Sequence, residues 1–341
     1  VHGRRVYIGN IKQNGVVHSD RMMKSRVNKF DTFPSGRGVV DVAIRDGESI
    51  VKLEAFADRI LQFKQKSLYV INVSESIDFL EDVYRNKGCE KDYHVVKTDY
   101  GITWFNKFGV YLFDGKNVLN LLEKDGIRLI SESEWETFIV DTNDTDMSEA
   151  HIAYIPKRRQ ILIKNQTTDI LLYDLVLRAW TKGIDRISFT TNMTNFALDS
   201  NQDLIYLHGS NSEMKVWRST SGTSSSGNFI YQTKDIDFGQ PSVRKKIYKV
   251  YVTYKTGTAT NVLVKYSADG NTVFDDGTNF SSNELANTGG SQWVQAILKP
   301  NTSSEANNIY SFALKFTNDG DVPATFEIND ITIVYRLKNI K

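Results

Sequence analysis

The chain has 341 residues, 40% of them hydrophobic, and its 42 lysines and arginines nearly balance 41 aspartates and glutamates, leaving a formal net charge of +1. This length suffices for two hydrophobic cores, and the near-zero charge excludes bulk electrostatic attraction to DNA or to an anionic membrane. No window of about 18 apolar residues occurs, so no membrane-spanning segment is predicted, and the chain does not open on a signal-peptide pattern.

Two further features of the sequence concern the compartment in which the protein folds and the extent of the chain. Cys89 is the single cysteine, which makes an intramolecular disulfide impossible and argues against a thiolate zinc site. Folding in a reducing cytosol is the simplest interpretation. Because the chain begins at Val1 and a strand-like run follows at Val6–Gly9, we expect it to be a piece of a longer protein.

The stretch Ile50–Val73 predicts three short β-strands joined by two polar turns. Its strands, Ile50–Phe56, Ile60–Phe63 and Leu68–Val73, are rich in the β-branched and aromatic residues that pack well on a pleated surface. The same plan recurs three times, in residues 101–122, 151–174 and 195–218. Asp114-Gly115, in the second unit, is a strong hairpin signal because both residues tolerate positive φ.

A further apolar run precedes each unit, at Val39–Ile44, Tyr93–Lys97, Glu136–Val140 and Ile187–Thr191. Four strands repeated at a period of roughly 45–50 residues are the signature of propeller blades. We therefore predict a β-propeller over residues 1–220, with about five blades visible and the set possibly incomplete. A β-sandwich or barrel of similar strand count is the alternative. Trp180 and Trp217 occupy late-strand positions where a blade needs a large packing residue.

One helix is predicted between the first two units. In Ser74–Lys91, Ile77, Leu80 and Tyr84 fall at helical spacing and Gly88 would cap the end.

The Ser/Gly-rich residues 221–228 predict a flexible linker, because such a segment has nothing to bury. Residues 229–341 then predict a separate β-sandwich of about seven strands. In Lys246–Tyr254, strict alternation would place Ile247, Lys249, Tyr251 and Thr253 on one face. In the last strand, Ile331, Ile333 and Tyr335 would share a face.

Two segments are similar to known sequence motifs. Ser267–Phe274 is similar to the Asp-box of sialidase-like propellers, but one residue is missing before Gly270, and a tight turn at Asp269-Gly270 is the simpler interpretation. Asp141–Asp146 offers oxygen ligands for calcium. Asp146 and Ile152 occupy the places where an EF-hand needs glycine and glutamate, which favours a solvated loop.

Catalytic patterns are equally weak. No two of the histidines His2, His18, His94, His151 and His208 are spaced to hold a metal on one element. No G-x-S-x-G elbow supports a Ser-His-Asp triad. Glu54, Asp58 and Asp99 are candidates for the paired carboxylates of a propeller glycosidase, but many other residues qualify equally. The sequence thus predicts no catalytic, cofactor-binding or metal-binding residue, no cofactor and no enzyme activity.

Four basic clusters are interpreted as solvated faces. They are Arg4-Arg5, Lys157–Arg159, Arg244–Lys246 and Arg336–Lys341. Interleaved aromatic residues for stacking single-stranded nucleic acid are absent around Lys157–Arg159. A phosphate-binding or interface role for Arg244–Lys246 is the alternative.

Several runs resemble the tail nozzle proteins of short-tailed phages, the tail tubular protein B class. They are residues 39–73, 100–115, 171–183, 229–254 and 326–339, the fourth reading FIYQTKDIDFGQPSVRKKIYKVYVTY. The resemblance implies a structural virion protein without an active site. It would act in a ring of copies, probably six, through which double-stranded DNA passes on ejection.

We therefore expect a component of the virion tail, assembled in the host cytoplasm and contacting adjacent tail or adaptor proteins. Two alternatives stay open. The first is a receptor- or glycan-binding tail module, in which Tyr251, Phe280 and Trp293 would be exposed. The second is a propeller glycosidase or lyase with carboxylates clustered at the axis.

Overall fold

The computed structural model describes residues 2–75, 77–140, 147–165, 169–183, 187, 196–208, 213–217, 230–256, 262–274, 280–282, 284–285, 292–301, 306–318, 322 and 326–338. In these ranges the regular secondary structure is almost entirely β-strand, as predicted, with one α-helix, α1 (Glu132–Ile139), and two 3-10 turns, η1 (Asp92–His94) and η2 (Pro156–Arg158). It divides into two compact units, Val1–Arg218 and Ser219–Lys341. The predicted linker at 221–228 lies outside the described residues.

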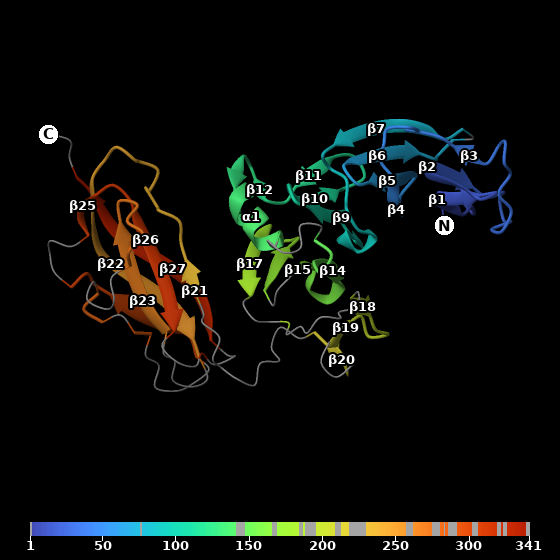
Figure 1. Ribbon diagram of the computed structural model, residues 1–341. Helices are drawn as coiled ribbons and strands as arrows, with labels where there is room; N and C mark the ends of the chain where they lie inside the picture. Colours follow the sequence, from blue (N-terminus) through green and yellow to red (C-terminus); the bar gives the residue numbers. More distant parts are fainter. Residues whose placement is uncertain are drawn as a thin grey trace. The chain divides into compact units, whose positions relative to one another are not determined.

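The first unit consists of antiparallel sheets that follow one another along the chain (Figure 1). The first sheet contains β1 (Tyr7–Gln13), β2 (Val16–Lys24) and β3 (Val39–Val40). The second contains β4 (Ile50–Phe56), β5 (Arg59–Lys64), β6 (Ser67–Asn72) and β7 (Phe79–Arg85). The third contains β8 (Val95–Thr98), β9 (Gly101–Asn106), β10 (Gly109–Phe113) and β11 (Val118–Asn120).

The hairpin of β12 (Glu123–Lys124) and β13 (Ile127–Arg128) leads into α1 and the remaining sheets. The fourth sheet contains β14 (His151–Ile155), β15 (Gln160–Lys164), β16 (Ile170–Asp174) and β17 (Ala179–Gly183). The fifth contains β18 (Ala197–Leu198), β19 (Leu204–His208) and β20 (Glu213–Val216). In all five sheets the strands pair in chain order, which makes each sheet a simple meander.

Both faces of the second sheet are buried against neighbouring sheets. Leu61 and Phe63 of β5 pack with Trp104 of the third sheet, whereas Ile60 packs on the opposite side with Met22 of the first. Because both of its faces are covered, β5 has buried apolar residues at the successive positions Ile60 and Leu61, where a half-exposed strand would alternate.

The next sheets pack in the same way. Phe105 and Ile152 share a core between the third and fourth sheets, and Leu162 and Leu204 share one between the fourth and fifth. Contacts between strands also link β1 with β4, β4 with β9, β8 with β14, and β14 with β19. Meander sheets that stack face to face in chain order form a propeller-like fold, which confirms the predicted fold class.

The predicted helix at Ser74–Lys91 is wrong. The segment forms the edge strand β7, whose backbone pairs with β6 from Asn72↔Phe79 to Ser67↔Arg85. Pairing with an existing sheet overrides a helical spacing that only a few apolar residues support. Gly88 does not cap a helix. A Cβ there would lie 2.3 Å from the carbonyl oxygen of Lys64, so the position requires glycine.

Two of the four predicted preceding strands are also wrong. Glu136–Val140 belongs to α1 and its C-cap, because Ser131 and Glu134 form a reciprocal capping box that starts a helix. In Val39–Ile44 only Val39 and Val40 are paired, and they belong to the first sheet. The fourth strands of the second and fourth sheets are β7 and β17, which follow their units. Of the run Ile187–Thr191, only Ile187 lies within the described residues.

The second unit consists of two antiparallel sheets packed face to face. One has the order β21 (Ile230–Gln232), β26 (Phe312–Asn318), β23 (Val262–Ala268). In the other, β22 (Lys245–Lys255) is central, with β24 (Val294–Leu298) and β25 (Asn307–Ile309) on one side and β27 (Glu327–Leu337) on the other. Val250 and Val252 pack between the sheets with Phe312 and Phe316, which makes this unit the predicted sandwich.

A β-bulge corrects the predicted alternation of β22. The register against β27 shifts between Ile247 and Lys249, so Tyr248 is an additional residue. Ile247 therefore joins Val250 and Val252 in the core, whereas Tyr248 and Lys249 both lie on the outer face. Strict alternation would have placed Ile247 on the outer face with Lys249.

Candidate functional site

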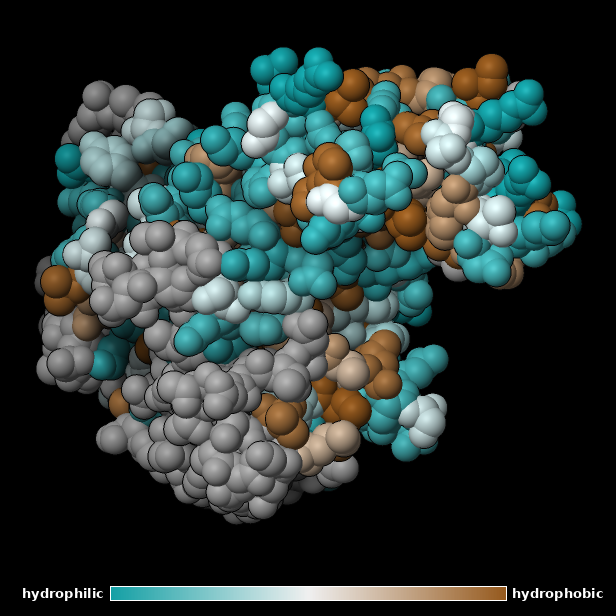
Figure 2. Space-filling model, turned by 45° about the vertical axis from the view of Figure 1, so that its right-hand side comes forward, coloured by the Kyte–Doolittle hydropathy of each residue, from teal (hydrophilic) through white to brown (hydrophobic). Residues whose placement is uncertain are grey.

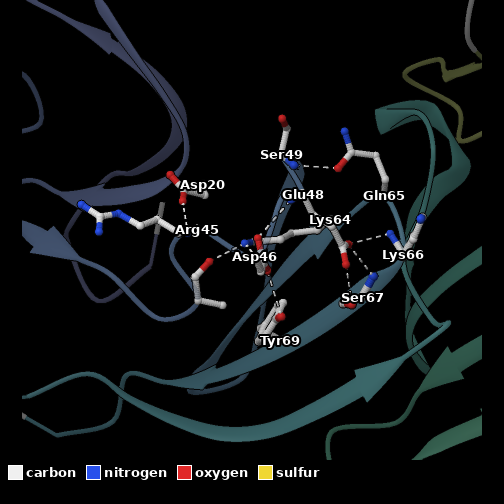
Figure 3. A network of polar contacts seen from close by, with 11 residues as sticks. Asp20, Arg45, Asp46, Glu48, Ser49, Lys64, Gln65, Lys66, Ser67 and Tyr69 are labelled. Carbon is white, nitrogen blue, oxygen red and sulfur yellow. Dashed lines mark hydrogen bonds and ion pairs between the residues drawn. The ribbon is translucent and has the colours of Figure 1, made fainter.

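A network of polar contacts around the buried Lys64 side chain holds the segment that enters the second sheet (Figure 3). The ammonium of Lys64, whose side chain is 0% exposed, donates to the carbonyl oxygen of Ala43 at 2.5 Å and to Asp46 Oδ2 at 2.7 Å. Tyr69 donates its hydroxyl to the same carboxylate at 3.1 Å. Burial acts to raise the pKa of Asp46, but hydrogen bonds and the Lys64 charge together outweigh it and lower this pKa, so the carboxylate is ionised at neutral pH.

The rest of the network fixes the same segment to the β5–β6 turn. Glu48 accepts hydrogen bonds from the main-chain N–H groups of Lys66 and Ser67 at 2.8 and 3.1 Å. Gln65 accepts one from the Ser49 N–H at 2.7 Å. These hydrogen bonds bind the segment that precedes β4 to the turn between β5 and β6 of the same sheet.

The same position carries a buried polar residue in the next two four-stranded sheets. Lys64, Asn106 and Lys164 are each the last residue of the second strand, and each is buried. Asn106 Nδ2 donates to the carbonyl oxygens of Asn86 and Gly88 at 3.1 and 3.0 Å, and Lys164 Nζ donates to that of Glu149 at 3.3 Å. We call these three residues the buried anchors, because each binds the main chain that leads into its own sheet.

Titratable side chains surround the segment before β14. His94 lies 3.1 Å from the carbonyl oxygen of Met147, Tyr93 donates to that of Ser148 at 2.7 Å, and His151 lies 2.9 Å from that of Glu149. The rings of Tyr93 and His151 are stacked at 4.6 Å. Burial, together with the Lys164 charge, lowers the pKa of His151, and burial lowers the pKa of Lys164 to about 8. Tyr93, His94 and His151 thus contact the backbone that leads into β14.

The three carboxylates weighed for a glycosidase each have a separate partner. Glu54 lies 4.0 Å from Lys52 Nζ, and Asp58 lies 3.9 Å from His2 Nε2. Asp99 accepts a hydrogen bond from the Tyr154 hydroxyl at 2.9 Å.

The other candidate ligands are likewise dispersed. Within the described ranges, no group of three or more His, Cys, Asp or Glu side chains is placed to hold a metal ion. Cys89 is buried and unpaired, and burial raises the pKa of its thiol. The side chain of His208 and the acidic loop Asp141–Asp146 lie outside the described residues. Asp269 has a positive φ and accepts hydrogen bonds from the Tyr310 and Ser311 N–H groups, as in the turn interpretation.

Two basic clusters have structural partners. Lys157 forms an ion pair with Asp203 at 2.6 Å. Lys245 is buried, and its ammonium donates to the carbonyl oxygens of Gln240 and Tyr310 at 2.5 and 2.8 Å, so it is not free to bind phosphate.

In the part of the chain that the structure describes, no helix is long and apolar enough to span a membrane.

One edge of the first unit exposes apolar side chains. β7 is the last strand of its sheet, and its Phe79, Leu80 and Val83 are exposed. Hydrophobic side chains appear in Figure 2 along the upper border, where Figure 1 places β7. An exposed apolar edge strand presents unpaired N–H and C=O groups together with hydrophobic surface, a combination suited to contact with another chain.

The outward face of the sheet β24–β22–β27 is the second exposed surface. Cross-strand neighbours on this face include Tyr251↔Ile297 and Tyr251↔Thr332. Trp293 and Tyr248 are 47% and 42% exposed. We call this surface the aromatic face; its residues are Lys246, Tyr248, Lys249, Tyr251, Thr253, Lys255, Trp293, Gln295, Ile297, Asn329, Asp330, Thr332, Val334 and Arg336.

Of the three aromatic residues expected to be exposed in a glycan-binding module, two lie on the aromatic face. Trp293 is exposed and Tyr251 is partly exposed, but Phe280 is 2% exposed and belongs to the core. Phe280 packs against Tyr266 with the ring centroids 4.9 Å apart, so its expected exposure is wrong. The sequence did not predict that Tyr248 is exposed on this face, because only the β-bulge directs its side chain outward.

Comparisons with known proteins define no family for this chain. No family model matches the sequence, and no curated protein matches it. Similar solved structures include a chain of the mitotic checkpoint complex, at 8% identity, covering 63% of this chain and 60% of that one, with a TM-score of 0.35. The WD40 domain of SCAP from fission yeast is similar at 7% identity, covering 88% and 77% of the two chains, with a TM-score of 0.33.

A third similar structure is the extracellular domain of a one component system from B. thetaiotaomicron, at 12% identity and a TM-score of 0.35. The match covers 78% of this chain but only 40% of that one. At such identities and TM-scores these similarities support no statement about activity, substrate or partner.

Proposed function

We propose that this chain is a non-enzymatic structural component of a phage virion tail, and that copies of it, probably six, form or buttress a ring around the genome-ejection channel. The proposal draws on the resemblance of residues 39–73 and 229–254 to tail nozzle proteins. In this role the chain would contact adjacent tail or adaptor proteins, and double-stranded DNA would pass through the ring.

The observation that best supports this role is that, in the second, third and fourth sheets, a buried polar side chain binds the sheet to the chain segment that enters it. Buried donor groups of Lys64, Asn106 and Lys164 form hydrogen bonds with main-chain carbonyl oxygens. Hydrophobic cores also join successive sheets. Polar groups satisfied in this way favour one rigid arrangement, because releasing any of them would leave a buried group unpaired. A ring that guides DNA needs rigid subunits, and its function is geometric.

The exposed apolar edge at β7 supports assembly. A ring of identical copies uses one patch that binds a different patch on the next copy. Phe79, Leu80 and Val83 offer such a patch, and their burial would contribute roughly 25 cal/mol for each Å² of apolar surface removed from water.

Oligomeric state tests the proposal. Light scattering with size-exclusion chromatography and negative-stain images should show rings for the purified chain. The double variant Leu80→Lys, Val83→Lys should shift the population to monomers. The double variant Val176→Lys, Leu177→Lys, which adds the same two charges at an exposed turn between β16 and β17, should leave the rings intact.

Two results would count against the proposal. A chain that stays monomeric at high concentration would contradict assembly into a ring. Label attached to the C-terminus and seen on the capsid surface of virions, rather than on the tail, would contradict the location. Rings that persist in the β7 double variant would show that another surface makes the contact.

A further inference from the structure

The aromatic face combines stacking surfaces, hydrogen-bonding groups and positive charge on one exposed sheet. We propose that it binds an acidic oligosaccharide, whose sugar rings would lie on the aromatic side chains and whose carboxylate or sulfate groups would bind the lysines. This inference goes beyond the structural role proposed above and does not depend on it.

Two β-bulges build this face. The first places Tyr248 and Lys249 outward in succession, between the buried Ile247 and Val250. The second shifts the register between Thr253 and Tyr254, and because Asp330 and Ile328 are their partners, Asn329 is the additional residue. Asn329 and Asp330 are consequently both exposed. Bulges often redirect side chains where a strand takes part in binding.

Each of the three aromatic rings on this face, those of Tyr248, Tyr251 and Trp293, has a lysine ammonium over it at cation–π distance. Lys249 Nζ lies 4.7 Å from the centroid of the Tyr251 ring, and Lys255 Nζ lies 5.0 Å from that of Trp293. Lys246 Nζ lies 5.4 Å from the Tyr248 ring. A sugar with a charged substituent presents the matching combination, an apolar ring face with an anionic group at its rim. From Lys246 to Lys255 the strand is about 30 Å long, enough for several sugar units.

The lysines of this face favour a negatively charged ligand. Within the described residues, Lys246 and Lys249 form no ion pair, whereas Lys255 lies 3.0 Å from Glu327. Lys246 lies opposite Arg336, which adds a further positive charge at that end of the face. An anionic group that reached Lys249 would form a charge-assisted hydrogen bond, which is stronger than a neutral one.

The polar side chains between the rings suit sugar hydroxyl groups. Gln295 and Thr253 lie opposite each other and share one long hydrogen bond of 3.5 Å. Asn329 donates to Asp330 at 3.2 Å. Amide and carboxylate groups held this loosely retain donors and acceptors for a ligand.

Other occupants fit the face less well. A two-fold contact between copies that kept the strands parallel would bring the basic end with Lys246, Lys249 and Arg336 onto its own like charges. Single-stranded nucleic acid also stacks on aromatic rings, but its phosphates would pass the carboxylates of Asp330 and Glu327. An acidic saccharide also has hydroxyl groups, which can donate hydrogen bonds to these carboxylates where a phosphodiester cannot.

Titration calorimetry on the full chain tests the proposal with three probes: a galacturonate hexamer, the neutral cellohexaose and a twelve-nucleotide oligothymidylate. We expect the galacturonate hexamer to bind with a Kd below about 1 mM and at least tenfold more tightly than cellohexaose. Trp293→Ala and Tyr251→Ala should each weaken it about threefold to tenfold, in line with the usual contribution of an aromatic contact. Lys249→Gln should weaken it about tenfold and leave any binding of cellohexaose unchanged.

Matched controls are available in the first unit. Lys107 Nζ lies 5.0 Å from the exposed ring of Phe108, so Phe108→Ala and Lys107→Gln remove a similar pair outside the face and should not change binding. Thermal unfolding of every variant should match that of the parent, since the replaced side chains are at least partly exposed. The proposal is overturned if the galacturonate hexamer does not bind, if face and control variants bind equally well, if cellohexaose binds as tightly, or if oligothymidylate binds more tightly.

Discussion

Replacing Lys64 by methionine should weaken the fold of the first unit. Methionine keeps most of the buried stem but removes the ammonium that bonds to the Ala43 carbonyl oxygen and to Asp46. The segment entering the second sheet would then lose a central connection in the network of Figure 3.

The magnitude follows from the partners left behind. A buried carbonyl without a donor costs about 1–3 kcal/mol, and removing one member of a buried ion pair costs about 3–5 kcal/mol. Asp46 is 24% exposed and keeps its bond from Tyr69, so water and that hydroxyl offset part of the second loss. We expect the free energy of unfolding to fall by about 2–4 kcal/mol, and the melting temperature to fall by about 5–15 °C in a unit of this size.

Urea unfolding followed by tryptophan fluorescence measures this change, because Trp104 and Trp135 are both buried in the first unit. Lys66→Met is the matched control, a lysine two residues further along in the exposed turn. It should change stability by less than about 0.5 kcal/mol. A Lys64→Met variant as stable as the Lys66→Met control would refute the argument that the buried anchor holds this segment.

Two further predictions concern pH and backbone geometry. Burial lowers the pKa of Lys164 to about 8 from 10.5, so the unfolded chain binds more protons between these values and stability should rise as pH increases from about 8 to 10.5. Urea unfolding at several pH values should show that the free energy of unfolding of the parent rises relative to that of Lys164→Met over this range. A difference between the two that does not depend on pH would contradict the prediction. Gly101→Ala should destabilise the fold by about 3 kcal/mol or more, because φ is +143° and the new Cβ would lie 2.0 Å from the Phe113 carbonyl oxygen. Gly36→Ala, which meets nothing within 4 Å, should be nearly neutral by the same denaturation assay, and equal effects of the two would refute the steric reasoning.

Some of the fold could be read from the sequence because burial imposes a composition. The strands of the unit at Ile50–Val73 were predicted to within one residue at each end, since runs rich in β-branched and aromatic residues are separated there by polar turns. The helix α1 was also within reach, because Ser131 and Glu134 carry a capping-box signature that the strand interpretation overlooked.

Features that depend on neighbouring segments were harder to predict. Apolar residues of Ser74–Lys91 satisfy a helical spacing, and only the free edge of β6 decides that the segment pairs as β7. Lys64 and Lys164 look like ordinary turn lysines, since a sequence does not show which carbonyls lie beside a side chain. The aromatic face depends on a bulge at Tyr248, a shift of one residue that leaves the local pattern of apolar residues almost unchanged.

By itself, the sequence determined that this protein is built of β-strands in repeated meanders followed by a sandwich, because the period and composition of apolar residues follow directly from which faces are buried. Only the tertiary structure decided which strand closes each sheet, which lysines are interior and which rings face water. These depend on contacts between segments far apart in the chain, and no local pattern encodes such a contact.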